Sequence, residues 1–110
     1  MFLGDRKVST TNFQSLAASF FRLADARLSD TQKQVLRMSH ELLKHHEMTL
    51  TALADQVSRR GALAYSTVKW NLRSLKNIGF LTGGNLSSKG QLACLTSEAR
   101  MLADYLANNL

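Results

Sequence analysis

The sequence predicts a mainly α-helical fold with one small β-hairpin near its C-terminal end. Apolar residues recur at intervals of three and four through most of the chain, and proline, the commonest helix breaker, is absent. Helical spacing gives way to short strand-like segments only after Gly79. Because 110 residues suffice for one core and not for two ordinary domains, we expect a single domain over residues 1–110. Within it we expect an N-terminal arm and helix over 1–28, a core over 29–95 and a C-terminal helix over 96–110.

Two amphipathic helices are predicted in the first half of the chain. The first spans 11–26, and Thr11 forms a capping box with Gln14 at its start. Its inward stripe comprises Phe13, Leu16, Ala17, Phe20, Leu23 and Ala24. The second begins at Ser29, whose capping partner is Gln32. Its inward stripe comprises Val35, Leu36, Ser39, Leu42 and Leu43.

Two shorter helices are predicted next, joined by a long turn that contains a glycine. The third helix covers 52–58 with Thr51 as its cap, and the turn covers Arg59–Ala64. The fourth has Ser66 as its cap and stops at Gly79. The inward positions are Leu53, Ala54, Val57, Val68, Leu72, Leu75 and Ile78. A short helix, a turn and a basic helix in this order predict a helix-turn-helix.

The segment after the fourth helix is predicted to form the hairpin and a final helix. Phe80–Thr82 and Gln91–Leu95 are the predicted strands, joined by a polar loop. Cys94 alternates with Leu92, so we expect its thiol to pack against the helices as a small hydrophobic group. The final helix begins at Thr96 or at the next residue. Its inward residues are Ala99, Leu102, Tyr105 and Leu106.

The charge of the chain is basic and unevenly distributed. There are 14 Lys and Arg against 8 Asp and Glu, a formal net charge of +6 at pH 7. Six of the basic residues and only one acidic residue, Asp55, lie between Ala52 and Leu95. Nearly all the excess therefore belongs to the helix-turn-helix and the hairpin, which indicates a polyanionic partner such as a nucleic acid.

The outward face of the fourth helix carries the side chains that DNA reading requires. A helical wheel places Ser66, Lys69, Trp70, Arg73 and Asn77 outward. Arg73 has the fork of donors that pairs with a guanine edge, and Asn77 or Asn71 is expected to pair with adenine. Lys69 and Lys76 are expected to neutralise phosphates.

Trp70 is the unusual member of this face, where a solvated helix carries Glu, Lys or Gln. Three interpretations stay open: contact with DNA, contact with a protein partner, or an indole folded back over neighbouring side chains. The second belongs to a rival hypothesis, a protein-docking module within a larger assembly with Trp70 as its anchor. RNA recognition by base stacking is disfavoured by the aromatic content of 7%.

Three blocks of the chain, Thr49–Ala54, Ser66–Leu81 and Leu95–Arg100, resemble winged helix-turn-helix transcription regulators, particularly those common in archaea. The resemblance runs from about Thr31 to Leu106 and implies that Tyr65–Ile78 is a recognition helix that binds double-stranded DNA. The residues that it places against DNA are Ser66, Thr67, Lys69, Trp70, Asn71 and Arg73. Members of this family usually act as homodimers, with two recognition helices in major grooves about 34 Å apart. The turn before this helix is longer here than in the family.

The expected binding surfaces extend beyond the recognition helix. Arg59 and Arg60 lie in the predicted turn, where a phosphate would pass, and a polar loop tipped by a cation forms either a wing on DNA or a plain connection. The full expected DNA-binding set is Arg59, Arg60, Tyr65, Ser66, Thr67, Lys69, Trp70, Asn71, Arg73, Lys76, Asn77, Ser87, Ser88 and Lys89. The expected dimer interface comprises Phe13, Phe20, Phe21, Met101 and Tyr105. Adjacent phenylalanines on a helix point about 100° apart, so one small core does not cover both.

Catalysis, metal binding and membrane insertion are not expected, and no cofactor is implied. No Ser-His-Asp order, paired catalytic carboxylates or phosphate-binding loop can be assembled. His40, His45 and His46 lack the four-residue spacing that places two metal ligands on one helix face. The most apolar stretch, 16–28, is interrupted by three charged residues. With a single cysteine and no visible secretory signal, we expect a cytoplasmic, non-enzymatic protein.

Overall fold

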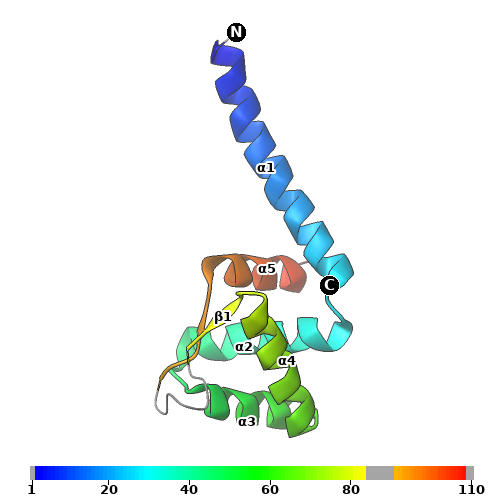
Figure 1. Cartoon of the computed structure of the whole chain (residues 1–110), viewed down its shortest axis with the longest axis vertical. Coiled ribbons are helices and arrows are strands. Elements are labelled where there is room, and N and C mark those ends of the chain that lie inside the picture. The colour runs from blue at the N-terminus through cyan, green and yellow to red at the C-terminus, as the bar shows by residue number, and fades with distance from the viewer. Residues whose placement is uncertain (1, 84–90, 109–110) are drawn as a thin grey trace.

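The computed structural model describes residues 2–83 and 91–108, and within them the side chains from residue 14 onward. Over these ranges the chain forms α1 (Phe2–Arg27), α2 (Asp30–His45), α3 (Leu50–Gly61), α4 (Tyr65–Asn77), β1 (Leu81–Thr82), β2 (Cys94–Leu95) and α5 (Ser97–Asn108). The predicted fold class, mainly α with a small hairpin and extra helices at both ends, is confirmed. Figure 1 shows α2 to α5 gathered into a body from which α1 projects.

Helix α1 is longer than predicted, and two of its predicted core residues are exposed. It begins at Phe2 rather than at Thr11, so the predicted capping box of Thr11 and Gln14 is wrong. No proline interrupts the preceding segment, and the helix continues through a capping signal that it does not use. Leu16 and Leu23, predicted to face the core, are 69% and 59% exposed. The reason is that the described side chains of α1 contact the body near its C-terminal end, where the helix packs on α5 and Phe20 meets Phe80 (Figure 1).

Helix α2 lies at the centre of the body and contacts α3, α4 and α5. It begins as predicted, because Ser29 Oγ accepts a hydrogen bond from the Gln32 N–H at 3.1 Å. In return, Gln32 Oε1 accepts one from the Ser29 N–H at 2.9 Å. The capping box therefore satisfies two N–H groups that the start of a helix leaves without intrahelical partners.

Helix α3 begins at Leu50, two residues earlier than predicted. Its N-cap is Thr49 and not Thr51, since Thr49 Oγ1 accepts a hydrogen bond from the Ala52 N–H at 3.2 Å. A cap residue has an extended backbone, and Thr49 takes that conformation (φ −72°, ψ 164°) while it forms a β-bridge with Leu92. Pairing with Leu92 thus holds Thr49 in the extended conformation that an N-cap residue needs.

The turn between α3 and α4 is shorter than predicted. Helix α3 continues to Gly61, so the turn is Ala62–Ala64 and the predicted turn over Arg59–Ala64 is wrong. The left-handed position that ends α3 is occupied by Ala62 (φ 52°, ψ 40°), although glycine is the usual residue there. Gly61 instead allows the end of α3 to lie close to α2, because a Cβ at this position would lie 3.0 Å from Met38 Sδ.

The two strands form the base of the hairpin. Leu81 lies opposite Leu95 and Thr82 lies opposite Cys94 in an antiparallel pair. Leu81 and Leu95 are buried, so Thr82 and Cys94 point to the outer face. The prediction that the Cys94 thiol packs against the helices is therefore wrong: Cys94 is exposed, and the true alternation has the opposite phase.

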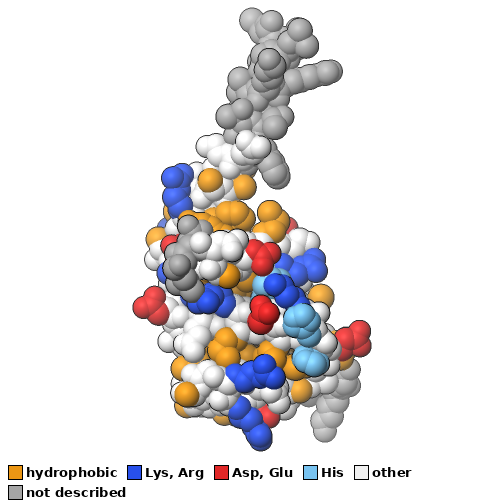
Figure 2. Space-filling model, turned by 180° about the vertical axis from the view of Figure 1, so that it is seen from behind, with side chains coloured by type: hydrophobic (Ala, Val, Ile, Leu, Met, Phe, Trp, Pro, Cys, Tyr) orange, Lys and Arg blue, Asp and Glu red, His pale blue; other side chains and the backbone are white. Residues whose placement is uncertain are grey.

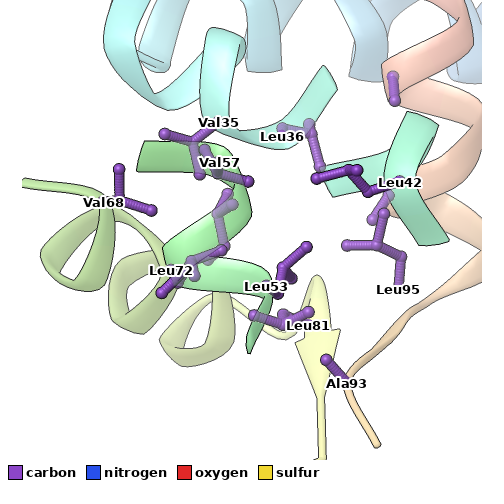
Figure 3. Close-up of a cluster of buried hydrophobic side chains, with 14 of the residues drawn as sticks. Val35, Leu36, Leu42, Leu53, Val57, Val68, Leu72, Leu81, Ala93 and Leu95 are labelled. Atoms are coloured by element: carbon purple, nitrogen blue, oxygen red, sulfur yellow. The ribbon is translucent and has the colours of Figure 1, made fainter. Parts of the chain in front are cut away.

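The core lies between α2, α3, α4, α5 and the hairpin, and Figure 3 shows much of it. Its largest fully buried apolar side chains are Leu36, Leu53, Leu72, Leu75, Leu81, Leu102, Val35, Val57 and Val68. Ile78, also predicted to belong to the core, is 51% exposed. It caps the end of α4, where the backbone (φ −85°, ψ 0°) leaves the helix and turns its side chain outward. Burial of Val68, Leu72 and Leu75 fixes which face of α4 remains outside.

Candidate nucleic-acid interface

The turn between α3 and α4 is held by one serine. Ser58 Oγ donates a hydrogen bond to the Leu63 carbonyl at 2.6 Å, and the Leu63 N–H donates to the Ser58 carbonyl at 3.1 Å. Both helices also pack on α2. The direction in which α4 leaves α3 is therefore fixed by the turn and by the helix beneath it, as a helix-turn-helix requires.

The inner face of α4 contains one polar residue. Asn71 is only 6% exposed, and its Nδ2 donates a hydrogen bond to the Thr67 carbonyl at 2.8 Å. Its amide therefore donates within the helix, and the structure places Asn71 away from the outer face, where the sequence predicted a contact with adenine. Thr67 itself is half-buried. The helical period explains the placement, because Asn71 follows the buried Val68 by three residues and precedes the buried Leu75 by four.

The outer face of α4 carries a straight row of exposed residues. Ser66, Trp70, Arg73 and Asn77 are all exposed, and their spacings of four, three and four place them in one line along the helix. We call these four residues the α4 row. Trp70 is 68% exposed, so its indole does not fold back over neighbouring side chains. The row holds side chains that the sequence predicted to face DNA.

The two flanks of the α4 row differ in chemistry. On one flank Tyr65 and Lys69 are exposed, and the Lys69 Nζ lies 5.7 Å from the centroid of the Tyr65 ring. Lys76, on the same flank, is half-buried. On the other flank Ser74 accepts a hydrogen bond from Gln32 Nε2 of α2 at 3.0 Å. Cations therefore line only one side of the row.

Arg59 and Arg60 are placed differently from the prediction. Both lie in the last turn of α3 and not in the turn that follows it. Both are exposed, and Arg59 Nε forms an ion pair with Asp55 Oδ1 at 3.2 Å. An exposed pair of this kind contributes little to stability, so the guanidinium can exchange its partner at small cost.

The expected wing residues Ser87, Ser88 and Lys89 lie outside the described residues. What is described is the base of the hairpin, where Gly83 has a φ of 91°. A Cβ at Gly83 would collide with the Leu92 carbonyl. The two segments of the hairpin therefore lie so close together here that only glycine fits. The base of the hairpin is thus fixed beside the end of α4, which contacts β1.

A second surface is formed by apolar side chains on α1 and α5. Leu16, Phe20 and Leu23 occupy one stripe of α1 at spacings of four and three, and all three are exposed. On α5, Met101 is also exposed. We call these four residues the apolar stripe. Figure 2 shows hydrophobic side chains gathered where α1 joins the body.

The predicted dimer residues fall into three groups. Phe20 and Met101 belong to the apolar stripe, whereas Phe21 is half-buried and packs on the half-buried Tyr105 of α5 with ring centroids 5.1 Å apart. The side chain of Phe13 lies outside the described part of the chain. Sequence reasoning assigned Leu16 and Leu23 to the core and so missed the most exposed large apolar side chains in the described part of α1. Their helical spacing was visible, but the absence of anything packed over it was not.

A polar hollow between α2 and α5 was not predicted. It has a volume of about 660 Å³ and is lined by side chains that include Lys33, Arg37 and Glu41. Across it His40 Nε2 lies 3.0 Å from Asp104 Oδ1. Figure 2 shows histidines beside acidic and basic side chains in the middle of the visible face. Within the described ranges, no three His, Cys, Asp or Glu side chains are grouped so that they would hold a metal ion.

Comparison with known proteins identifies the fold. No family model and no curated protein sequence matches the chain. Solved structures do match, and they share the winged helix-turn-helix fold of transcription regulators. Among the described helices, none has the length and apolar character needed to cross a membrane.

Three of the matching structures come from bacteria. MepR of Staphylococcus aureus, a transcription regulator of the multidrug efflux pump MepA, has a TM-score of 0.60 at 13% identity, covering 94% of this chain and 71% of that one. A MarR-family transcriptional regulator from Rhodococcus has a TM-score of 0.57 at 15% identity, with 98% and 74% covered. Staphylococcus aureus MarR, solved with salicylate and kanamycin, has a TM-score of 0.57 at 20% identity, with 98% and 67% covered. The fold of this chain is therefore that of MarR-type regulators, and its resemblance to archaeal regulators in particular remains an expectation.

Proposed function

We propose that the chain is a transcription regulator that binds specific sequences of double-stranded DNA as a homodimer. The observation that carries the proposal is the α4 row: Ser66, Trp70, Arg73 and Asn77 stand exposed in line on a helix that contains no acidic residue. On a helix held at the surface by a helix-turn-helix, this is the arrangement that enters a major groove. The likeness to solved transcription regulators supports it.

Each exposed group of α4 has a role in this proposal. The Arg73 guanidinium donates two hydrogen bonds to a guanine edge, and Asn77 pairs with adenine. Lys69 and Lys76 neutralise phosphates on one side of the groove. Arg59 and Arg60 reach the backbone from the end of α3, and Lys89 reaches it from the wing. These contacts need neither a cofactor nor a catalytic group, so we propose no enzymatic activity, and we place the protein in the cytoplasm with the DNA.

The apolar stripe supports the homodimer. Leu16, Phe20 and Leu23 form a row long enough to pack against a second helix, and Met101 extends the surface onto α5. A second copy placed by a twofold axis would cover the same side chains on both chains. Such a dimer would contain two copies of α4, and binding to a palindromic site requires both of them on one side.

The test is a fluorescence-anisotropy titration at two salt concentrations. Labelled duplexes from the region around the protein's own gene are compared with a scrambled duplex of equal length. We expect preferential binding that weakens steeply with salt, because neutralised phosphates release counterions. Arg73→Ala should weaken binding by about 1–3 kcal/mol. Arg100→Ala is the matched control, since Arg100 is exposed on α5 and away from the α4 row.

A second candidate function is favoured by the exposure of Trp70. Trp70 is 68% exposed, and exposed tryptophans often anchor protein–protein interfaces. Binding through such an anchor depends weakly on salt, whereas DNA binding depends on it strongly. The absence of binding to any duplex at low salt would contradict the DNA proposal and favour docking.

A further inference from the structure

Trp70 occupies the middle of the α4 row. Ser66 precedes it by four residues and Arg73 follows it by three, so the ring stands between a small hydroxyl group and a long cation. An exposed indole is a large apolar surface, and covering it gains free energy mainly when the surface that covers it is apolar too. A partner that reads this row should therefore offer an apolar group between its polar ones.

The neighbouring cations do not cover the indole. The Lys69 Nζ is directed to the ring of Tyr65, 5.7 Å from its centroid, and not to Trp70. The indole thus stays open while a donor-rich side chain, Arg73, stands one turn further along the same line. This alternation of an apolar group and a hydrogen-bond donor gives α4 a pattern that a base sequence can match.

The major groove of DNA offers one apolar group at its base edges. The C5-methyl group of thymine projects into it, whereas the other readable groups are hydrogen-bond donors or acceptors. We propose that Trp70 selects thymine in the DNA site by apolar contact with this methyl group. This inference rests on the proposed function, because it assumes that α4 enters a major groove.

The expected size of the effect follows from the group removed. Burying a single methyl-sized group changes a binding constant about fourfold, which is about 0.8 kcal/mol at 1.4 kcal/mol per tenfold. A homodimer that contacts one thymine in each half-site would show about a fifteenfold change. Both values are within the range that a competition titration resolves.

The experiment removes the methyl group and nothing else from the bases. The wild-type chain first enriches duplexes from a random library, and the enriched pool is copied once with dTTP and once with dUTP. We expect the wild type to bind the dUTP copy about four to fifteen times more weakly. Trp70→Ala should bind both copies equally. Trp70→Phe, which keeps an aromatic surface without the indole N–H, should retain the preference for the dTTP copy.

The matched control is Arg73→Ala. Arg73 belongs to the same row but would read a polar edge, so its loss should weaken binding to both copies and leave their ratio unchanged. Equal binding of both copies by the wild type, or an unchanged ratio in Trp70→Ala, would overturn the inference while leaving DNA binding intact. Loss of the ratio in Trp70→Phe, which keeps an aromatic surface at this position, would also overturn the proposed apolar contact. Failure to enrich any duplex would contradict the proposed function itself, that is, binding to double-stranded DNA.

Discussion

Gln32 Nε2 donates a hydrogen bond to Ser74 Oγ at 3.0 Å, and this contact joins the first turn of α2 to α4. The other end of the same amide accepts a hydrogen bond from the Ser29 N–H at 2.9 Å. One side chain thus caps the central helix and holds the candidate recognition helix against it. The orientation of α4 depends in part on a residue that touches nothing in the α4 row.

Ser74→Ala should therefore lower the free energy of unfolding by about 0.5–1.5 kcal/mol through the loss of this hydrogen bond. Gln32→Ala should cost about 1–3 kcal/mol, because it removes part of the capping box as well. Urea denaturation monitored by circular dichroism measures both. Ser66→Ala is the control, since it makes the same change at an exposed position of α4. Equal stability of Ser66→Ala and Ser74→Ala would contradict the role of the contact.

Two asparagines of α4 should behave in opposite ways. Asn71→Ala removes a buried amide and its hydrogen bond to Thr67, so we expect a loss of about 1–2 kcal/mol in stability. DNA binding by the folded protein should stay the same. Asn77→Ala should leave stability within about 0.5 kcal/mol and weaken binding by about 1–3 kcal/mol. Thermal unfolding and anisotropy titration on both variants provide the check. A binding defect in Asn71→Ala at full folding would restore Asn71 to the DNA-contacting set.

Leu23→Glu should separate the proposed dimer. The substitution places a charge in the apolar stripe, and pairing it against the same stripe of a second copy would bury that charge without a partner. We expect sedimentation equilibrium to give the mass of one chain, and affinity for a palindromic duplex to fall by about a hundredfold or more. Gln14→Glu adds the same charge to an exposed position of α1 and should change neither. If the Leu23→Glu variant remained dimeric, the dimer interface would have to lie outside the apolar stripe.

Ala62→Gly should stabilise the protein. Ala62 has a φ of 52°, a conformation that costs an L-residue with a side chain about 1 kcal/mol and costs glycine almost nothing. Since glycine also makes the unfolded chain more flexible, which offsets about 0.4–1 kcal/mol of this, we expect a net gain of at most about 0.6 kcal/mol. Ala52→Gly is the control, because Ala52 is exposed in the helical backbone of α3, where glycine is disfavoured and should only lose stability. A fall in the melting temperature of Ala62→Gly would show that the left-handed turn costs little.

Sequence reasoning succeeded where a local signal and the core agreed. The Ser29–Gln32 capping box and the buried set Val68, Leu72 and Leu75 are confirmed, and with them the outer face of α4. A capping box depends on residues three apart, and a helical stripe depends on a fixed period, so both are legible without knowledge of the fold. This is why all five residues that the helical wheel placed outward on α4 are exposed in the structure: Ser66, Lys69, Trp70, Arg73 and Asn77.

Sequence reasoning failed where contacts between distant segments of the chain determine the local structure. Thr49 rather than Thr51 caps α3 because Thr49 pairs with Leu92 across the sheet, which no local rule reports. Cys94 was assigned to the wrong face because the register of a short strand is set by its partner. Leu16 was assigned to the core because periodicity shows that a stripe exists but not whether anything covers it.

Thr49 serves two elements at once, since it caps α3 through the Ala52 N–H and bridges Leu92 at the base of the hairpin. Beside it the Ala93 N–H donates to the Met48 carbonyl at 2.7 Å. The wing strand and the start of α3 therefore belong to one cooperative opening unit. In hydrogen–deuterium exchange the amides of Ala52 and Ala93 should lose protection together, so that the hairpin cannot swing free of the helix-turn-helix without unwinding the first turn of α3.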